Sequence, residues 1–98
     1  MYRATTPKHT FKLPMETSLI DSLIISYAQK GKVIIEKHLE DVDLEDNSIT
    51  VTLTQEETNL FTKSCTAQVQ LRIKVGEYVH ASDIMEIKVN DVLNDEVM

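Results

Sequence analysis

The stretch CTAQVQLRIKV, residues 65–75, alternates apolar and polar side chains along its whole length. The odd-numbered positions are all apolar, and the even-numbered positions are polar and include Gln68, Gln70 and Arg72. Successive side chains of a β-strand point to opposite faces, so a period of two indicates a strand with one face in a core and the other in water. Such half-buried strands are typical of antiparallel sheets, and the stretch therefore predicts an all-β protein.

The same alternation recurs on both sides of this stretch, with candidate turns at Gly31 and Gly76. Six to eight short strands at such regular spacing predict an antiparallel sandwich or barrel. No linker or change of composition divides the chain, so we expect a single domain over residues 1–98, with residues 1–7 as an extended arm. The further strands are expected at 8–13, 21–29, 32–39, 47–54, 78–82 and 83–89.

One segment breaks the alternation. TQEETNLF, residues 54–61, has Thr54 and Glu57 in the spacing of a capping box, in which each side chain bonds the backbone N–H of the other residue. We therefore expect one short helical turn near residues 55–61, with Leu60 and Phe61 packed on the core.

Composition narrows the possible classes of function. The net charge is −6, which disfavours general affinity for nucleic acid or anionic lipid, because both require clustered basic side chains. No apolar run approaches the roughly 18 residues that span a membrane. The first ten residues, MYRATTPKHT, have no apolar segment typical of a signal peptide, so synthesis inside the cell is expected.

The stretch DVDLED, residues 41–46, alternates acids as the start of a calcium loop does. A calcium loop requires glycine at its sixth position and glutamate at its twelfth, where this chain has Asp46 and Thr52. The stretch is better interpreted as an acidic strand edge followed by a turn. We expect neither a metal nor a cofactor.

The candidate catalytic residues are few. His9, His38 and His80 lie on separate segments without metal-ligand spacing, and His9 shares parity with Phe11, as a hydrogen-bonded histidine at the end of a core face would. Cys65, the only cysteine, opens the apolar parity of the longest strand and is predicted to be a small buried hydrophobe. No nucleophile, base and orienting group can be assembled, so we expect no enzyme.

Four phrases carry a resemblance over nearly the whole chain. The chain resembles small proteins encoded among the structural genes of phages and prophages in Firmicutes. Its layout is similar to the N-terminal β-sandwich module of phage baseplate upper proteins. The phrases are ATTPKHTFKLP (4–14), ISYAQKGKVIIEK (25–37), VTLTQEET (51–58) and AQVQLRIKV (67–75).

With the resemblance, the fold expected is an all-β, antiparallel immunoglobulin-like β-sandwich of about six to eight strands. The resemblance implies a non-enzymatic structural or accessory protein in a phage tail, baseplate or neck assembly. Its expected partners are other phage structural proteins and further copies of itself, with no nucleic acid and no membrane. It would lie in the host bacterial cytoplasm during assembly and then in the virion. An alternative is a module that binds carbohydrate or the host surface. The expected contact residues are Tyr2, Arg3, Thr5 and Thr6 in the arm, and Gln68, Gln70 and Arg72 on the strand face.

Overall fold

The alternating stretch forms the longest strand of the protein, β6, in a computed structural model that describes residues 1–98. Ala67, Val69, Leu71 and Ile73 are buried, whereas Arg72 and its charged neighbour on the same face are exposed. The expected division into a core face and a water face is confirmed. In chain order the elements are β1 (Lys8–Lys12), η1 (Thr17–Leu19), β2 (Ser22–Gln29), β3 (Lys32–His38), η2 (Leu39–Asp41), β4 (Val42–Glu45), β5 (Ser48–Thr52), α1 (Gln55–Thr58), β6 (Thr66–Val75), β7 (Tyr78–Ala81) and β8 (Met85–Lys88).

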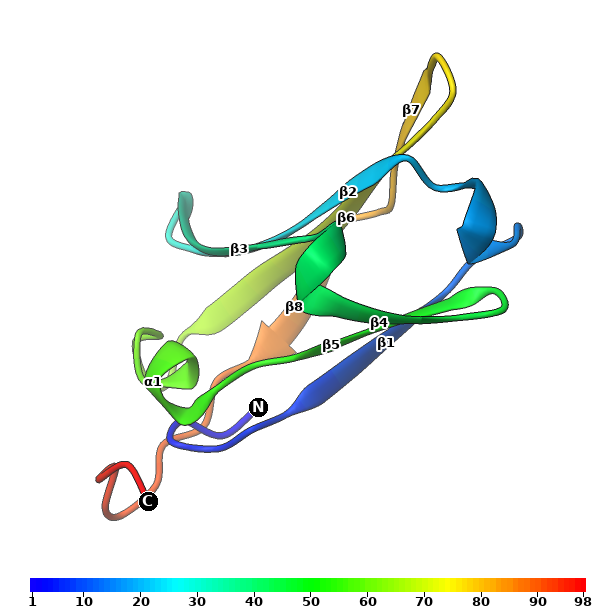
Figure 1. Cartoon of the computed structure of the whole chain (residues 1–98). Helices are drawn as coiled ribbons and strands as arrows, with labels where there is room; N and C mark the ends of the chain where they lie inside the picture. The colour runs from blue at the N-terminus through cyan, green and yellow to red at the C-terminus, as the bar shows by residue number, and fades with distance from the viewer.

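The strands form two antiparallel sheets, and Figure 1 shows them one above the other. The large sheet has the order β3-β2-β6-β7, and β8 also pairs with β6. β7 pairs with residues 72–75 of β6, and β8 pairs with residues 66–69. The two short strands therefore lie along the same edge of β6. The small sheet has the order β1-β5-β4.

A single cluster of 14 buried hydrophobic residues lies between the sheets. The small sheet contributes Ile49 and Val51 from β5, and the large sheet contributes Ile25 and Tyr27 from β2, all 0% exposed. Burial of such side chains stabilises the fold by about 1.5–3 kcal/mol each. The apolar parity of the strands is therefore what holds the two sheets together.

The turn between β2 and β3 lies at Lys30 and Gly31, as expected. Both residues have positive φ, 53° and 76°. A two-residue hairpin with positive φ at both central positions matches the right-handed twist of the strands it joins. Gly31 adopts this conformation without steric cost, since it has no Cβ.

The capping box at α1 is confirmed. Thr54 Oγ1 accepts from the Glu57 N–H at 3.1 Å, and Glu57 Oε1 accepts from the Thr54 N–H at 2.9 Å. The helix ends at Thr58, earlier than expected. Phe61 is buried, but the prediction for Leu60 is wrong, because its side chain is 60% exposed. None of the helices has both the length and the apolar character needed to cross a membrane.

Candidate interaction surfaces

The acidic stretch 41–46 forms the end of η2, strand β4 and the turn to β5. Asp41 Oδ2 accepts from the His38 N–H at 2.9 Å, so this carboxylate closes the turn at η2. Asp46 has a φ of 31° in the turn, a conformation that aspartate tolerates better than most residues. No group of three or more histidine, cysteine, aspartate or glutamate side chains is placed so that it could hold a metal ion. The interpretation as strand edge and turn describes this segment correctly.

His9 lies against the core, hydrogen-bonded to Tyr27 at 2.6 Å through Nδ1. Burial, and secondarily the positive amino terminus, lowers the pKa of His9, so the neutral imidazole is favoured. Burial, and secondarily the charge of Glu57, raises the pKa of Tyr27, so its hydroxyl stays protonated. Either atom of this bond can be the donor, according to which nitrogen of the neutral imidazole carries the proton. This pair joins the two sheets.

The other two histidines lie elsewhere in the fold. His38 ends β3, with Nε2 3.6 Å from a Glu36 carboxylate, and His80 is exposed on β7. Cys65 is a free, half-buried cysteine just before β6. Its carbonyl accepts from the Gln29 side-chain amide at 3.3 Å, so the backbone of this residue anchors a loop.

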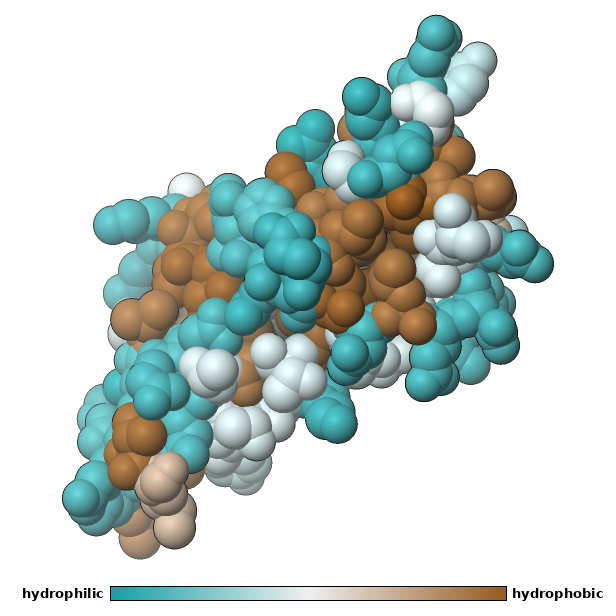
Figure 2. Space-filling view, in the orientation of Figure 1, coloured by the Kyte–Doolittle hydropathy of each residue, from teal (hydrophilic) through white to brown (hydrophobic).

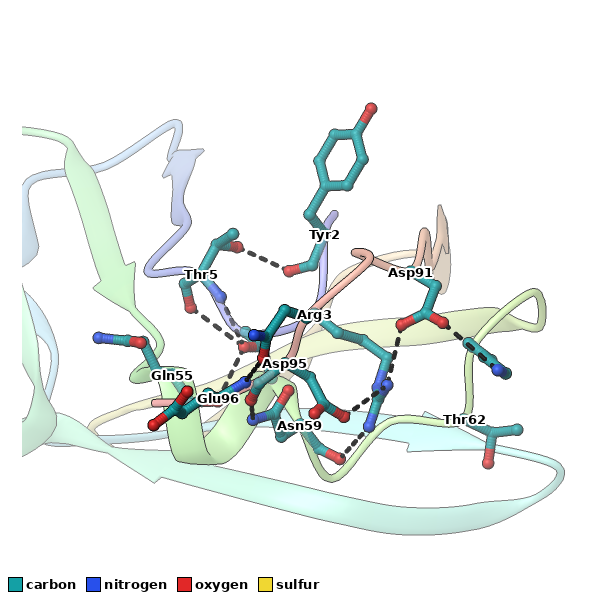
Figure 3. A network of polar contacts seen from close by, with 12 residues as sticks. Tyr2, Arg3, Thr5, Gln55, Asn59, Thr62, Asp91, Asp95 and Glu96 are labelled. Carbon is teal, nitrogen blue, oxygen red and sulfur yellow. Dashed lines mark hydrogen bonds and ion pairs between the residues drawn. The ribbon is translucent and has the colours of Figure 1, made fainter. Parts of the chain in front are cut away.

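The N-terminal segment lies against the C-terminal segment of its own chain, as Figure 3 shows from close by. The Met1 amino group donates to the Lys88 carbonyl at 2.8 Å. The Asn90 N–H donates to the Met1 carbonyl at 2.7 Å, and the Arg3 N–H donates to the Asn90 carbonyl at 2.9 Å. Tyr2 and Asn90 form an isolated parallel bridge.

Arg3 is the centre of a polar network at this end of the molecule (Figure 3). Its guanidinium lies 3.0 Å from Asp91 and 3.5 Å from Asp95, and it also donates to the Asn59 carbonyl at 3.2 Å. A backbone hydrogen bond from Val92, supported by the bond from Arg3, lowers the pKa of Asp91. Only 16% of the Arg3 side chain is exposed, so most of its surface is engaged within the chain.

The other arm residues divide into engaged and exposed ones. The Thr5 N–H donates to Thr58 Oγ1 at 3.2 Å, and Thr5 Oγ1 donates to the Tyr2 carbonyl at 2.6 Å. The side chains of Tyr2 and Thr6 are exposed. Of the four arm residues expected to contact a partner, these two present their side chains to the surface.

The three strand residues expected to bind a partner lie together on the outer face of the large sheet. Gln68 and Gln70 are half-buried and Arg72 is exposed. Gln70 Nε2 donates to the Ser82 carbonyl at 3.0 Å, which ties the loop after β7 to this face. Their cross-strand neighbours on β2 are half-buried as well: Ala28, Ser26 and Ile24.

A role of Gln29 was missed by sequence reasoning. Its side chain is 3% exposed. Its amide oxygen accepts from the Thr62 N–H at 2.6 Å, and its amide nitrogen donates to the Thr62 and Cys65 carbonyls at 3.0 and 3.3 Å. The sequence did contain a signal for this role. Gln29 lies two residues after Tyr27 on β2, so its polar side chain points to the same buried face.

Apolar side chains also reach the surface of the molecule. Figure 2 shows a band of them between polar neighbours, in the region between the two sheets on the side that faces the viewer. Comparisons with known proteins found no family model, no curated protein and no solved structure that matches this chain.

Proposed function

We propose that this chain is a non-enzymatic structural or accessory protein of a phage or prophage. It acts through protein–protein contacts in a tail, baseplate or neck assembly, is made in the host bacterial cytoplasm and becomes part of the virion. The four sequence phrases support the phage origin. Two antiparallel sheets on one core are compatible with the immunoglobulin-like sandwich of the resemblance, and that finer layout is part of this proposal.

One observation carries the proposed contact, namely a strip of mostly uncharged side chains on the outer face of the large sheet, where β2 pairs with the middle of β6. Gln68, Gln70 and Arg72 face Ala28, Ser26 and Ile24 of β2, so these six central positions hold one charged side chain. Charged residues other than arginine are depleted at the centres of protein interfaces. Charged side chains border this strip, since Glu36 of β3 lies across from Ser26 and Glu86 of β8 lies across from Gln68. A less charged centre with a polar rim is the usual arrangement of an interface.

Mass spectrometry of purified virions tests this function. We expect the protein to copurify with virion structural proteins and to be lost when Gln68 and Arg72 are both replaced by alanine. Lys74→Ala is the matched control, since Lys74 is exposed on the same face of the same strand. Absence of the wild-type protein from virions would remove the proposal.

One observation favours the alternative of carbohydrate or host-surface binding. Tyr78 is 71% exposed at the start of β7, as an aromatic ring that stacks on a sugar must be. Tyr27 is buried, which leaves Tyr2 and Tyr78 as the available tyrosines. A glycan array on which wild-type protein binds and Tyr78→Ala does not would support this role, and an array without binding would exclude it.

A further inference from the structure

The small sheet is narrower than the large one. It is three strands wide. The large sheet is four strands wide, because β7 and β8 lie end to end along the same edge of β6. β1 pairs with β5 alone, so its other edge is free. The strand position that would continue the small sheet beyond β1 holds no strand of this chain.

Two hollows lie beside β1, between the sheets. One, of about 350 Å³, is lined by Phe11 of β1, Val69 of β6 and Ile87 of β8. The other, of about 360 Å³, is lined by Leu13 after β1, Leu71 of β6 and Ala81 of β7. Together they follow β1 along its length and reach the apolar core. An added strand would place alternate side chains in them, as in β-strand addition.

The backbone of β1 can accept such a strand. The Leu13 N–H donates to Asn47 and the Leu53 N–H donates to Pro7. Because hydrogen-bonded pairs alternate along an antiparallel ladder, the backbone groups of Lys8, Thr10 and Lys12 point away from β5. The edge therefore offers donors and acceptors to a neighbour.

The opposite edge of the small sheet is β4, and its pattern complements this site. Leu44 lies across from Ile49 on the inward face, but Leu44 is 40% exposed whereas Ile49 is fully buried. The inward face of β4 is therefore partly uncovered. Asp43 and Glu45 flank Leu44 in the sequence, so their side chains point to the outward face, where Asp43 lies across from Thr50.

The charges of the two edges are opposite. Lys8, Thr10 and Lys12 lie on the outward face of the small sheet, where Thr10 bonds Thr50 at 3.0 Å through their hydroxyls. The ion pairs within the chain join other residues, so these lysines and the acids of β4 have no ion-pair partner in it. Opposite charges across strands stabilise a pairing and like charges oppose it.

From these observations we infer that a second copy of this chain adds its β4 to the free edge of β1. Leu44 then enters the space beside Phe11, and Asp43 and Glu45 lie beside Lys8 and Lys12. This inference rests on the proposed function, since it names one contact through which the assembly forms.

The geometry sets the direction of assembly. β1 and β4 are both antiparallel to β5, so they run parallel to each other, and successive copies add head to tail. Pairing β1 with β1 would oppose lysine to lysine, and pairing β4 with β4 would oppose acid to acid. A head-to-tail contact closes into a ring or continues as a filament.

Analytical ultracentrifugation at low ionic strength tests the contact. We expect wild-type protein to self-associate, and Lys8→Glu/Lys12→Glu and Asp43→Lys/Glu45→Lys each to weaken association about ten-fold or more, because each makes the two edges alike in charge. Mixing the two variants restores association, as does the quadruple exchange, which keeps the net charge of −6. The control Lys32→Glu/Lys74→Glu changes charge equally on the other sheet and leaves association unchanged. Circular dichroism verifies that each variant is folded.

The inference is overturned if wild-type protein stays monomeric, or if association survives either edge exchange. A monomeric protein that is nevertheless found in virions would overturn the edge contact and leave the proposed function standing. Copies that associate through these edges but are absent from virions would support the contact and remove the phage function. If incorporation of this protein into virions requires the β1 lysines but not the β4 acids, another chain occupies the edge. That outcome would overturn self-assembly.

Discussion

The hydroxyl of Tyr27 lies 2.6 Å from Nδ1 of His9, and this hydrogen bond joins β2 of the large sheet to β1 of the small sheet. Their rings lie 5.6 Å apart, and Tyr27 also packs edge-on against Phe61. The contact places a polar pair at the border of an apolar core. It holds in position the strand whose other edge is free.

Replacing Tyr27 with phenylalanine should lower the free energy of unfolding by about 1 kcal/mol, because it removes a hydrogen bond and leaves His9 Nδ1 without its partner. Urea unfolding measures the change. The control Tyr78→Phe removes an exposed hydroxyl and should have little effect. Equal stabilities of the two variants would contradict a role for the inter-sheet bond.

Stability should decrease as the pH falls below about 6.5, the ordinary pKa of histidine. Burial lowers the pKa of His9 in the folded protein, so the unfolded chain binds this proton at a higher pH than the folded chain does. The stability is therefore full above the unfolded pKa and is lost as the pH falls toward the folded one. Urea unfolding at several pH values between 7.5 and 5.5 measures this loss. His9→Gln should flatten the profile, and an unchanged profile would assign the effect to other groups.

Replacing Gln29 with alanine should lower the free energy of unfolding by about 2 kcal/mol. The backbone N–H and carbonyl of Thr62 and the carbonyl of Cys65 would lose part-buried hydrogen bonds to this side chain, and each such bond contributes about 0.5–1.5 kcal/mol. Gln68→Ala, on the outer face of the neighbouring strand, is the matched control and should change little. Amide exchange that stays slow at Thr62 in the Gln29 variant would argue against the anchoring of this loop.

Replacing Thr54 with alanine should lower the free energy of unfolding by about 1 kcal/mol, because the Glu57 N–H loses its cap. Thr62→Ala is the control, since the contacts of Thr62 are made by its backbone and its side chain is exposed. Chemical unfolding of both variants supplies the comparison. A Thr54 variant as stable as wild type would show that α1 is held by Phe61 alone.

Replacing Arg3 with alanine should loosen the N-terminal segment while changing global stability by about 1 kcal/mol, because its acidic partners Asp91 and Asp95 are partly exposed and ion pairs near the surface contribute little. The expected result is faster hydrogen exchange at the Arg3 and Asn90 amides, which bridge the two ends of the chain. Lys63→Ala removes another contact to Asp91 from a mostly exposed side chain and should leave those amides protected. Unchanged exchange in the Arg3 variant would mean that the backbone bridge alone holds the arm.

Local features were predictable from sequence because their causes lie within a few residues. The capping box needs only Thr54 and Glu57, and the hairpin turn needs only Lys30 and Gly31. The buried parity of β6 follows from the pleat of a single strand. Leu60 and Phe61 show the limit of this reasoning, since adjacent apolar residues after α1 are separated by the direction in which the chain leaves the helix.

The sequence by itself determined where seven of the eight strands form and which face of the core strands is apolar, because period-two alternation and turn residues act locally. Strand β4, in the acidic stretch, was not among the expected strands. Only the tertiary structure decided which strands are neighbours. It placed β7 and β8 on one edge of β6, tied residues 1–3 to the C-terminal segment, and brought His9 to Tyr27. It also left β1 and β4 as the two free edges of the small sheet, with opposite charges. The physical reason is that strand order depends on contacts between residues distant in sequence, and no local pattern encodes these partners.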